Sequence, residues 1–179
     1  MAIESLLTPE LKAWIGTEIE VGQEKFPISE EMIYELVDAI EDPNPLFLDP
    51  EYAQRSRFGG LLCPPLATRK ARAPITIDYF GLGQDRHFSL PLPFRSYGFN
   101  GGTLITFHRP AYVGDRMSGV TRYVDMYERL GRSGQLLFVV REGRETNQRN
   151  ELVHTSRSSS IFRKRPETEA ADKPPPSGP

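Results

Sequence analysis

The chain has 179 residues, of which 38% are hydrophobic and 26% charged, with a formal net charge of −2 at pH 7. This composition fits one globular domain with a core of ordinary size, and the balanced charge argues against a nucleic-acid coat or a polybasic membrane anchor. No apolar run approaches the about 20 residues that a membrane span needs, and the N-terminus lacks the basic start of a secretory signal, so a soluble, cytoplasmic protein is expected. The single Cys63 excludes an internal disulfide and a multi-cysteine zinc site.

Helical signals lie in the first third of the chain. A short strand is predicted at residues 17–22, where polar and apolar side chains alternate. A helix is predicted from Ser29, a good N-cap residue, through Ile40, and it ends before Pro43. One apolar face of this helix is formed by Met32, Ile33, Leu36, Val37 and Ile40. One or two further helical turns are predicted at residues 50–57.

The second half of the chain is typical of an antiparallel sheet. Long strands separated by turn signals are predicted at residues 103–109, 116–127, 135–146 and 151–162. Their spacing suits a meander, and the run Leu136–Val140 is apolar on both faces, which predicts a central strand. The connection 61–100 is rich in proline and irregular, with a helix expected around residues 66–73. Residues 166–179 form a proline-rich tail that we expect to be disordered, which leaves residues 3–165 as the domain.

Two sequence blocks carry a family resemblance. The run Asp42-Pro43-Asn44-Pro45-Leu46-Phe47-Leu48-Asp49 is followed by Arg57-Phe58-Gly59-Gly60, and the run Phe99-Asn100-Gly101-Gly102-Thr103 is followed by Val113-Gly114-Asp115. The first block resembles the D-x-N-P-x-H-x-D segment of the MaoC-like, R-specific enoyl-CoA hydratases and dehydratases. The second block looks like the N-terminal-type half of that family. The resemblance covers most of the chain, and the two blocks occur in the order found in the family.

The resemblance implies an α+β hot-dog fold, in which an antiparallel sheet wraps around a helix. It further implies pairs of hot-dog units, acyl-CoA substrates bound near the interface, and reversible addition of water to an enoyl thioester. The CoA thioester is then the substrate, and no separate cofactor is expected. No histidine, cysteine or carboxylate cluster has metal-ligand spacing, so no metal is expected either.

The departure from the motif decides the functional prediction. In catalytic members Asp and His of the motif perform the acid/base work, but the position of the histidine is Phe47 here, and phenylalanine carries no proton. Asp42 alone is a poor base at pH 7, because its ordinary pKa is about 3.9. In addition, Pro64 and Pro65 remove two backbone donors where the family forms an oxyanion hole.

The resemblance therefore implies a subunit that shapes the acyl pocket while a partner chain supplies the catalytic Asp and His. Asp42 is the candidate catalytic residue of this chain. The candidate substrate-binding residues are Asn44, Phe47, Phe58, Gly59 and Gly60. A simpler interpretation gives Asp42 and Asn44 an ordinary turn after the helix. Phe47 is expected in the core or in a pocket lining, and Asp49 is expected to cap the helix at Pro50.

Other proton-carrying residues were weighed against structural roles. His87 is a candidate replacement for the missing base, whereas His108 and His154 are expected to be structural, and Cys63 is expected to be buried and inert. The basic residues of the irregular connection, which are solvated by default but suit CoA phosphates, are Arg69, Lys70, Arg72 and Arg86.

Three hypotheses stay open from the sequence. The leading one is a hydratase or dehydratase subunit that forms a heterodimer with a catalytic MaoC-like chain. The second is a homodimeric hydratase that uses an unusual base, and the third is a non-catalytic acyl-CoA or fatty-acid binding homodimer. Dimerisation of some kind is expected, because a hot-dog sheet leaves an edge strand to be covered.

Overall fold

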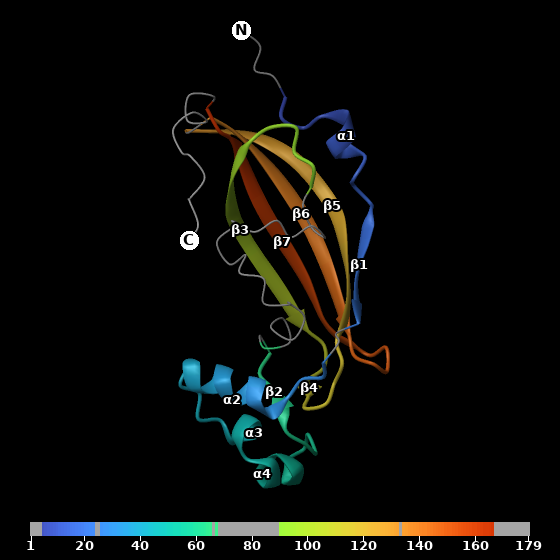
Figure 1. Cartoon of the computed structure of the whole chain (residues 1–179), viewed down its shortest axis with the longest axis vertical. Helices are drawn as coiled ribbons and strands as arrows, with labels where there is room; N and C mark the ends of the chain where they lie inside the picture. Colours follow the sequence, from blue (N-terminus) through green and yellow to red (C-terminus); the bar gives the residue numbers. More distant parts are fainter. Residues whose placement is uncertain (1–4, 24–25, 66, 68–89, 133, 167–179) are drawn as a thin grey trace, which may run out of the picture.

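A five-stranded antiparallel sheet forms the larger part of the chain, and its strand order is β1-β5-β6-β7-β3 (Figure 1). The computed structural model describes residues 5–23, 26–65, 67, 90–132 and 134–166. The strands are β1 (Glu18–Gln23), β3 (Ser96–Phe107), β5 (Ser118–Gly131), β6 (Gly134–Thr146) and β7 (Leu152–Lys164).

The sheet confirms the predicted strands and corrects their connection. Strand β6 is central, as the apolar run Leu136–Val140 predicted, and β5, β6 and β7 form a meander. Strand β3, however, pairs with β7 at the sheet edge and does not pair with β5, so the meander prediction was wrong for this strand.

Strand β3 also begins at Ser96, earlier than the predicted Thr103, because the Asn-Gly-Gly run forms a bulge inside the strand. Asn100 Oδ1 accepts the Gly102 N–H at 2.8 Å, and Gly102 has a φ of 107°, which favours glycine.

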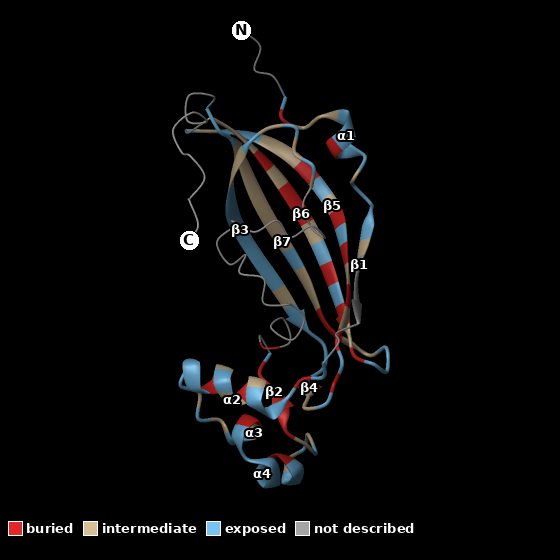
Figure 2. Ribbon diagram, viewed as in Figure 1, coloured by how far each residue is buried: buried red, intermediate tan, exposed pale blue. Residues whose placement is uncertain are grey.

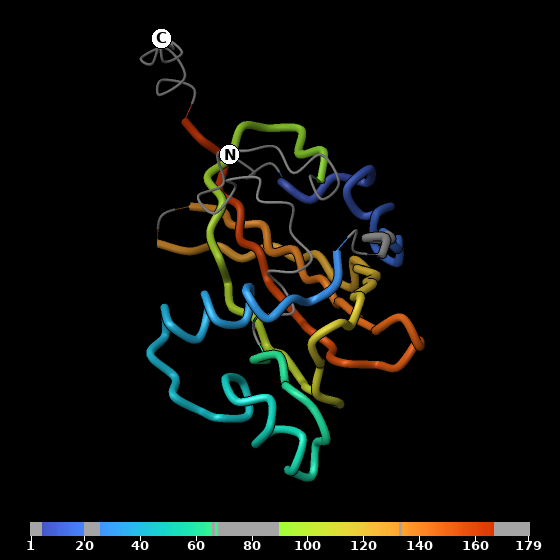
Figure 3. Tube along the Cα trace, turned by 60° about the horizontal axis from the view of Figure 1, so that its bottom comes forward, coloured from blue at the N-terminus to red at the C-terminus, as the bar shows by residue number. Residues whose placement is uncertain are grey.

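Short helices and a two-stranded ribbon gather beyond one end of the sheet (Figures 1 and 3). They are α2 (Glu30–Ala39), α3 (Pro45–Leu48), α4 (Pro50–Arg55), and the antiparallel pair β2 (Leu62–Cys63) with β4 (Ala111–Tyr112). A further short helix, α1 (Pro9–Lys12), lies beside the sheet. This end of the molecule carries the first sequence block of the family resemblance.

Helix α2 forms where its sequence predicted. The Ser29 side chain accepts the Met32 N–H at 3.2 Å, and Glu30 and Glu31 lie in the first turn, where the helix dipole favours negative charge. Ile33 and Val37 are buried one turn apart, so they attach the helix to the core.

Two hydrophobic clusters hold the fold together (Figure 2). One joins the helical end to the sheet and contains, among its fully buried members, Ile28, Ile33, Met117 and Val153. The other lies on one face of the sheet, where Leu11 of α1 packs with Tyr123, Met126, Leu137 and Val139. The tyrosine hydroxyl is largely enclosed there, and burial raises the pKa of Tyr123.

Several sequence predictions lie outside the described residues. They are the helix around residues 66–73, the basic residues Arg69, Lys70, Arg72 and Arg86, the candidate base His87, and the tail beyond Pro166. Within the described ranges, no helix has the length and apolar character that crossing a membrane requires.

Candidate functional site

An apolar hollow of about 300 Å³ lies where the helical end meets the sheet. Helix α3, the ribbon β2–β4 and the ends of β3 and β7 surround it. Its lining residues are Phe47, Phe58, Leu62, Cys63, Pro65, Phe107, His108, Arg109, Pro110, Ala111 and Val153. Most of this lining is carbon, so the hollow suits an apolar group.

Phe47 reaches the hollow from α3 and is 9% exposed. The helix is set by the Asp-Pro-Asn-Pro run. Asn44 Oδ1 accepts the Leu46 N–H at 3.0 Å, and Pro45 occupies the first turn, where no backbone donor is needed. The sequence motif thus builds the short helix that carries Phe47 into the pocket wall.

Asp42 and Asn44 use their side chains on the local backbone. Asp42 Oδ1 accepts the Asn44 N–H at 3.1 Å, and Asn44 caps α3, which is the turn arrangement expected as the simpler interpretation. Neither residue lines the hollow. Their candidate roles in catalysis and substrate binding stay predictions.

Of the other predicted binding residues, one lines the hollow and two do not. Phe58 lines the hollow beside Phe47, and its carbonyl accepts the Tyr112 hydroxyl at 3.2 Å. Gly59 and Gly60 do not line it. Gly59 has a φ of 68°, a turn conformation that glycine adopts without strain, and its role in substrate binding stays a prediction.

Cys63 lies in the wall of the hollow and is buried. Desolvation by burial, with a further contribution from the Asp115 carboxylate, raises the pKa of the Cys63 thiol to about 12. A thiol with this pKa is almost wholly protonated at pH 7, so Cys63 offers no nucleophile.

His108 and Arg109 lie in the same wall, and both are exposed to solvent. His108 Nε2 lies 3.1 Å from the Thr155 hydroxyl oxygen, and Arg109 forms a 3.0 Å ion pair with Glu151. Glu151 is shared with Arg149 and accepts the side-chain N–H of Asn147, and these contacts hold the pKa of Glu151 below its usual range. The polar part of the wall is therefore held by strand β7, through His108, and by the turn between β6 and β7, through Arg109.

A buried histidine, His154, contacts the ring of Phe107. His154 and Glu145 face each other across β7 and β6, and both are buried. His154 Nε2 lies 3.0 Å from Glu145 Oε2, within ion-pair distance but without hydrogen-bond alignment. The His154 ring also meets the Phe107 ring edge to face at 5.8 Å. His154 is not among the residues that line the hollow, and its structural role stays a prediction.

Sequence reasoning missed several lining residues. Phe107 and Val153 come from the ends of β3 and β7, and Pro110 comes from the connection between β3 and β4; all three are far from the motif in the chain. Alternation along residues 103–109 is a signal that one face of the strand is inward, but only the folded chain brings Phe107 beside the motif, where it lines the same hollow as Phe47.

The chemistry of this site follows from its composition. The hollow can hold an apolar chain, and its one imidazole among the described residues is that of His108, in a solvent-exposed part of the wall. At the motif position where a general base is expected, Phe47 supplies only hydrocarbon. The described residues contain no cluster of three His, Cys, Asp or Glu side chains able to hold a metal ion.

Residues 13–156 match the protein family described as "FAS1-like, dehydratase domain region". A UPF0336 protein of Saccharopolyspora erythraea is 30% identical over 149 residues, which is 80% of this chain and 81% of that protein. A UPF0336 protein of Thermobifida fusca is 31% identical over 104 residues, and the chain spans 64% of its length.

Solved structures share the fold at lower identity. The HadBC (3R-hydroxyacyl-ACP dehydratase) complex of Mycobacterium tuberculosis superposes with a TM-score of 0.63 and 20% identity, covering 83% of this chain and 96% of that one. The ChsH1–ChsH2 complex of the same organism superposes with a TM-score of 0.66 and 16% identity, covering 88% of this chain and 89% of that one. A MaoC-like dehydratase from Rhodospirillum rubrum superposes with a TM-score of 0.61 and 22% identity, covering 85% of this chain and 94% of that one.

Proposed function

Because the chain belongs to the FAS1-like dehydratase-domain family and has the hot-dog fold of MaoC-like hydratases, we propose that it is the pocket-shaping subunit of an acyl-thioester hydratase or dehydratase. A partner hot-dog chain supplies the catalytic Asp and His, and the two together add water reversibly to an enoyl thioester. The observation that carries the proposal is Phe47, which lies in the wall of the apolar hollow at the position of the motif histidine.

The two other candidate catalytic groups, Cys63 and Asp42, support these separate roles of the two subunits. Cys63 stays protonated, and Asp42 binds the backbone of its own turn outside the lining. General acid/base catalysis requires a group with a pKa near the operating pH within hydrogen-bond reach of the reacting water. The motif provides no such group here, so the hollow is suited to hold the acyl chain.

The edge strand supports the partner. Within the described part of the chain, β3 pairs with β7 alone, which leaves its outer side as a row of backbone donors and acceptors. Exposed apolar side chains follow this strand, with Phe99 50%, Leu104 69% and Phe107 45% exposed. The HadBC and ChsH1–ChsH2 structures are complexes of two different chains, which favours a heterodimer here over a homodimer.

The test is co-expression with a MaoC-like chain that has an intact D-x-N-P-x-H motif. We expect a stable complex that hydrates enoyl-CoA, and Phe99→Glu is expected to break it, because the charge would replace an exposed apolar side chain of β3 where the partner strand packs. Leu130→Glu is the matched control, since Leu130 is 71% exposed at the far end of β5. Loss of assembly in both variants, or in neither, contradicts pairing through β3.

His108 favours a second candidate, a homodimeric hydratase with an unusual base. It is the imidazole in the wall of the hollow, where the sequence suggested His87 for this role. This candidate predicts turnover by the purified chain alone that is abolished by His108→Ala or Asp42→Asn. Tight acyl-CoA binding with no turnover under any condition would instead indicate the non-catalytic binding homodimer. A cytoplasmic location remains a prediction for all three.

A further inference from the structure

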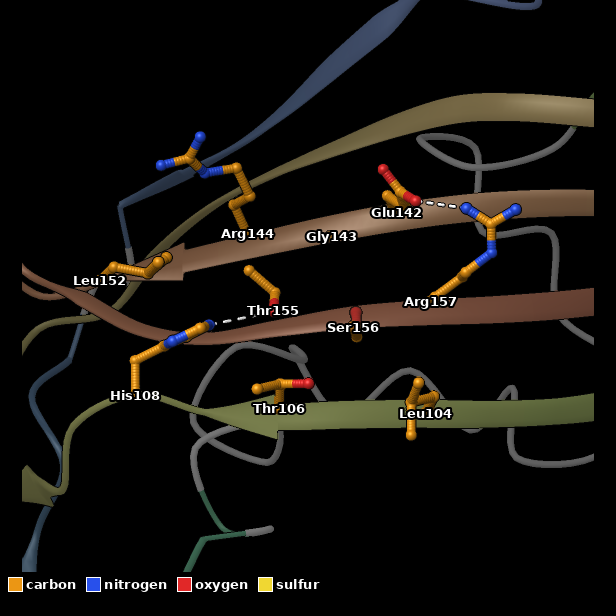
Figure 4. A pocket seen from close by; sticks show the side chains of 10 residues that line it. All are labelled: Leu104, Thr106, His108, Glu142, Gly143, Arg144, Leu152, Thr155, Ser156 and Arg157. Carbon is orange, nitrogen blue, oxygen red and sulfur yellow. Dashed lines mark hydrogen bonds and ion pairs between the residues drawn. The ribbon is translucent and has the colours of Figure 1, made fainter.

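A second hollow, with a volume of about 440 Å³, lies on the sheet (Figure 4). It is on the opposite face from the hydrophobic cluster that contains Leu11, Leu137 and Val139. Strands β3, β7 and β6 form its floor, where Thr106, Thr155 and Arg144 stand abreast in the pairing register. Its lining residues are Leu104, Thr106, His108, Glu142, Gly143, Arg144, Leu152, Thr155, Ser156 and Arg157.

The two hollows meet at His108, which lines both. They differ in chemistry. The first is walled by phenylalanine, proline and aliphatic carbon, whereas the second presents two guanidinium groups and two threonine hydroxyls. A ligand with an apolar tail and a polar, anionic head would find matching surfaces in these two hollows on either side of His108.

Charge in the second hollow favours an anion. Arg144 is exposed, and no carboxylate among the described residues pairs with it, whereas Arg157 is paired with Glu142 (Figure 4). The surrounding sheet is basic as well, because Arg and Lys outnumber Asp and Glu along residues 95–165. Almost all of these cations are arginine, whose planar group binds phosphate oxygens in pairs.

We infer that the second hollow binds a phosphate group of the thioester carrier, held by Arg144 and Arg157 with the hydroxyls of Thr106 and Thr155. This inference rests on the proposed function, since it assigns the acyl chain to the first hollow and the carrier to the second. The shared chemistry is a phosphate, borne by CoA or by the phosphopantetheine arm of a carrier protein. Glu142 is then a competitor of the phosphate for Arg157.

Binding is tested first with the full chain and coenzyme A, by calorimetric titration at low salt. We expect Arg144→Ala to weaken binding about tenfold, the loss typical of one charge-assisted hydrogen bond, and added salt to weaken the wild type. Glu142→Gln is expected to tighten binding, because it frees Arg157. Arg132→Ala is the matched control, since Arg132 is an exposed arginine at the β5–β6 turn, outside the hollow. Equal losses for Arg144→Ala and Arg132→Ala, or no binding of coenzyme A, would overturn the inference.

Kinetics of the assembled complex separate this inference from the proposed function. Arg144→Ala is expected to raise the KM for crotonyl-CoA about tenfold, with kcat unchanged. The KM for crotonyl-pantetheine, which has no phosphate, is expected to stay the same. A wild-type complex that turns over neither substrate contradicts the proposed function, and the titration with coenzyme A still tests the site. Turnover with an unchanged KM in Arg144→Ala contradicts the phosphate site alone.

A third substrate, crotonyl-4′-phosphopantetheine, distinguishes the two sources of phosphate. If its KM rises as much as that of crotonyl-CoA, the site holds the phosphate common to CoA and carrier protein. If only crotonyl-CoA is affected, the site holds the nucleotide phosphates. Both results support a phosphate site, whereas a loss that extends to crotonyl-pantetheine contradicts it.

Discussion

Replacing Phe47 with alanine tests the geometry on which the proposed function depends. Phe47 is 9% exposed and packs in the cluster that includes Ile33, Val37 and Met117, but one side of its ring borders the hollow of about 300 Å³. Phe→Ala in a fully packed core costs about 3–5 kcal/mol. Because part of the ring already faces empty space, fewer contacts are lost here, and we expect a cost of about 2–3 kcal/mol in the free energy of unfolding.

Urea and thermal unfolding of the wild type and the variant measure this cost. For a chain of this length, about 2–3 kcal/mol corresponds to a fall in Tm of roughly 5–10 °C. Leu48→Ala is the control within the same helix, because Leu48 is 39% exposed and its truncation should cost less than about 1 kcal/mol. Removal of the ring also widens the hollow, so bulkier acyl ligands should bind more tightly to the variant.

Equal costs for the two variants would refute the reasoning. They would show that Phe47 does not pack between the core and the hollow. The position of the missing histidine would then lie away from the acyl site, and the proposed division of labour would lose its main support.

Three further predictions follow from the same contacts. Asn44→Ala removes the cap of α3 and should cost about 1 kcal/mol in urea unfolding, while Asn44→Asp, which retains the acceptor, should cost little. The pKa of Cys63 rises from 9.0 to about 12, so its thiolate population is roughly a thousandfold lower. The native protein should therefore resist alkylation by iodoacetamide at pH 8 and react once it is unfolded. Rapid alkylation of the native chain would contradict this. His154→Ala leaves the buried Glu145 carboxylate without this partner and should cost about 3 kcal/mol, whereas the exposed His108→Ala should change stability by less than about 0.5 kcal/mol, and equal costs would count against the buried pair.

The fold was largely predictable because its signals are local. Ser29 and the apolar face of α2 define one helix, and the doubly apolar run Leu136–Val140 marks the central strand. The early start of β3 was not predictable in the same way, since Asn100 and Gly102 indicate a turn locally and form a bulge only because β7 pairs on both sides of them. The position of β3 beside β7 depends on the whole sheet.

The candidate site was only partly predictable. Phe47 and Phe58 follow from the motif, and both line the hollow. The polar motif residues were harder to place, because Asp42 and Asn44 suit a turn as well as a site, and the structure shows their side chains on the turn backbone. For His108 the sequence predicted a structural role, because its place between the two hollows depends on how the chain passes from β3 to β4.

Enoyl-CoA hydration by the purified chain, alone and mixed with a catalytic MaoC-like partner, tests the central claim most directly. Loss of the conjugated thioester absorbance is followed across several acyl lengths. We predict no turnover by this chain alone and turnover in the mixture, lost when the partner lacks its motif histidine. Turnover by this chain alone that His108→Ala abolishes would contradict the claim and assign the chemistry to this subunit.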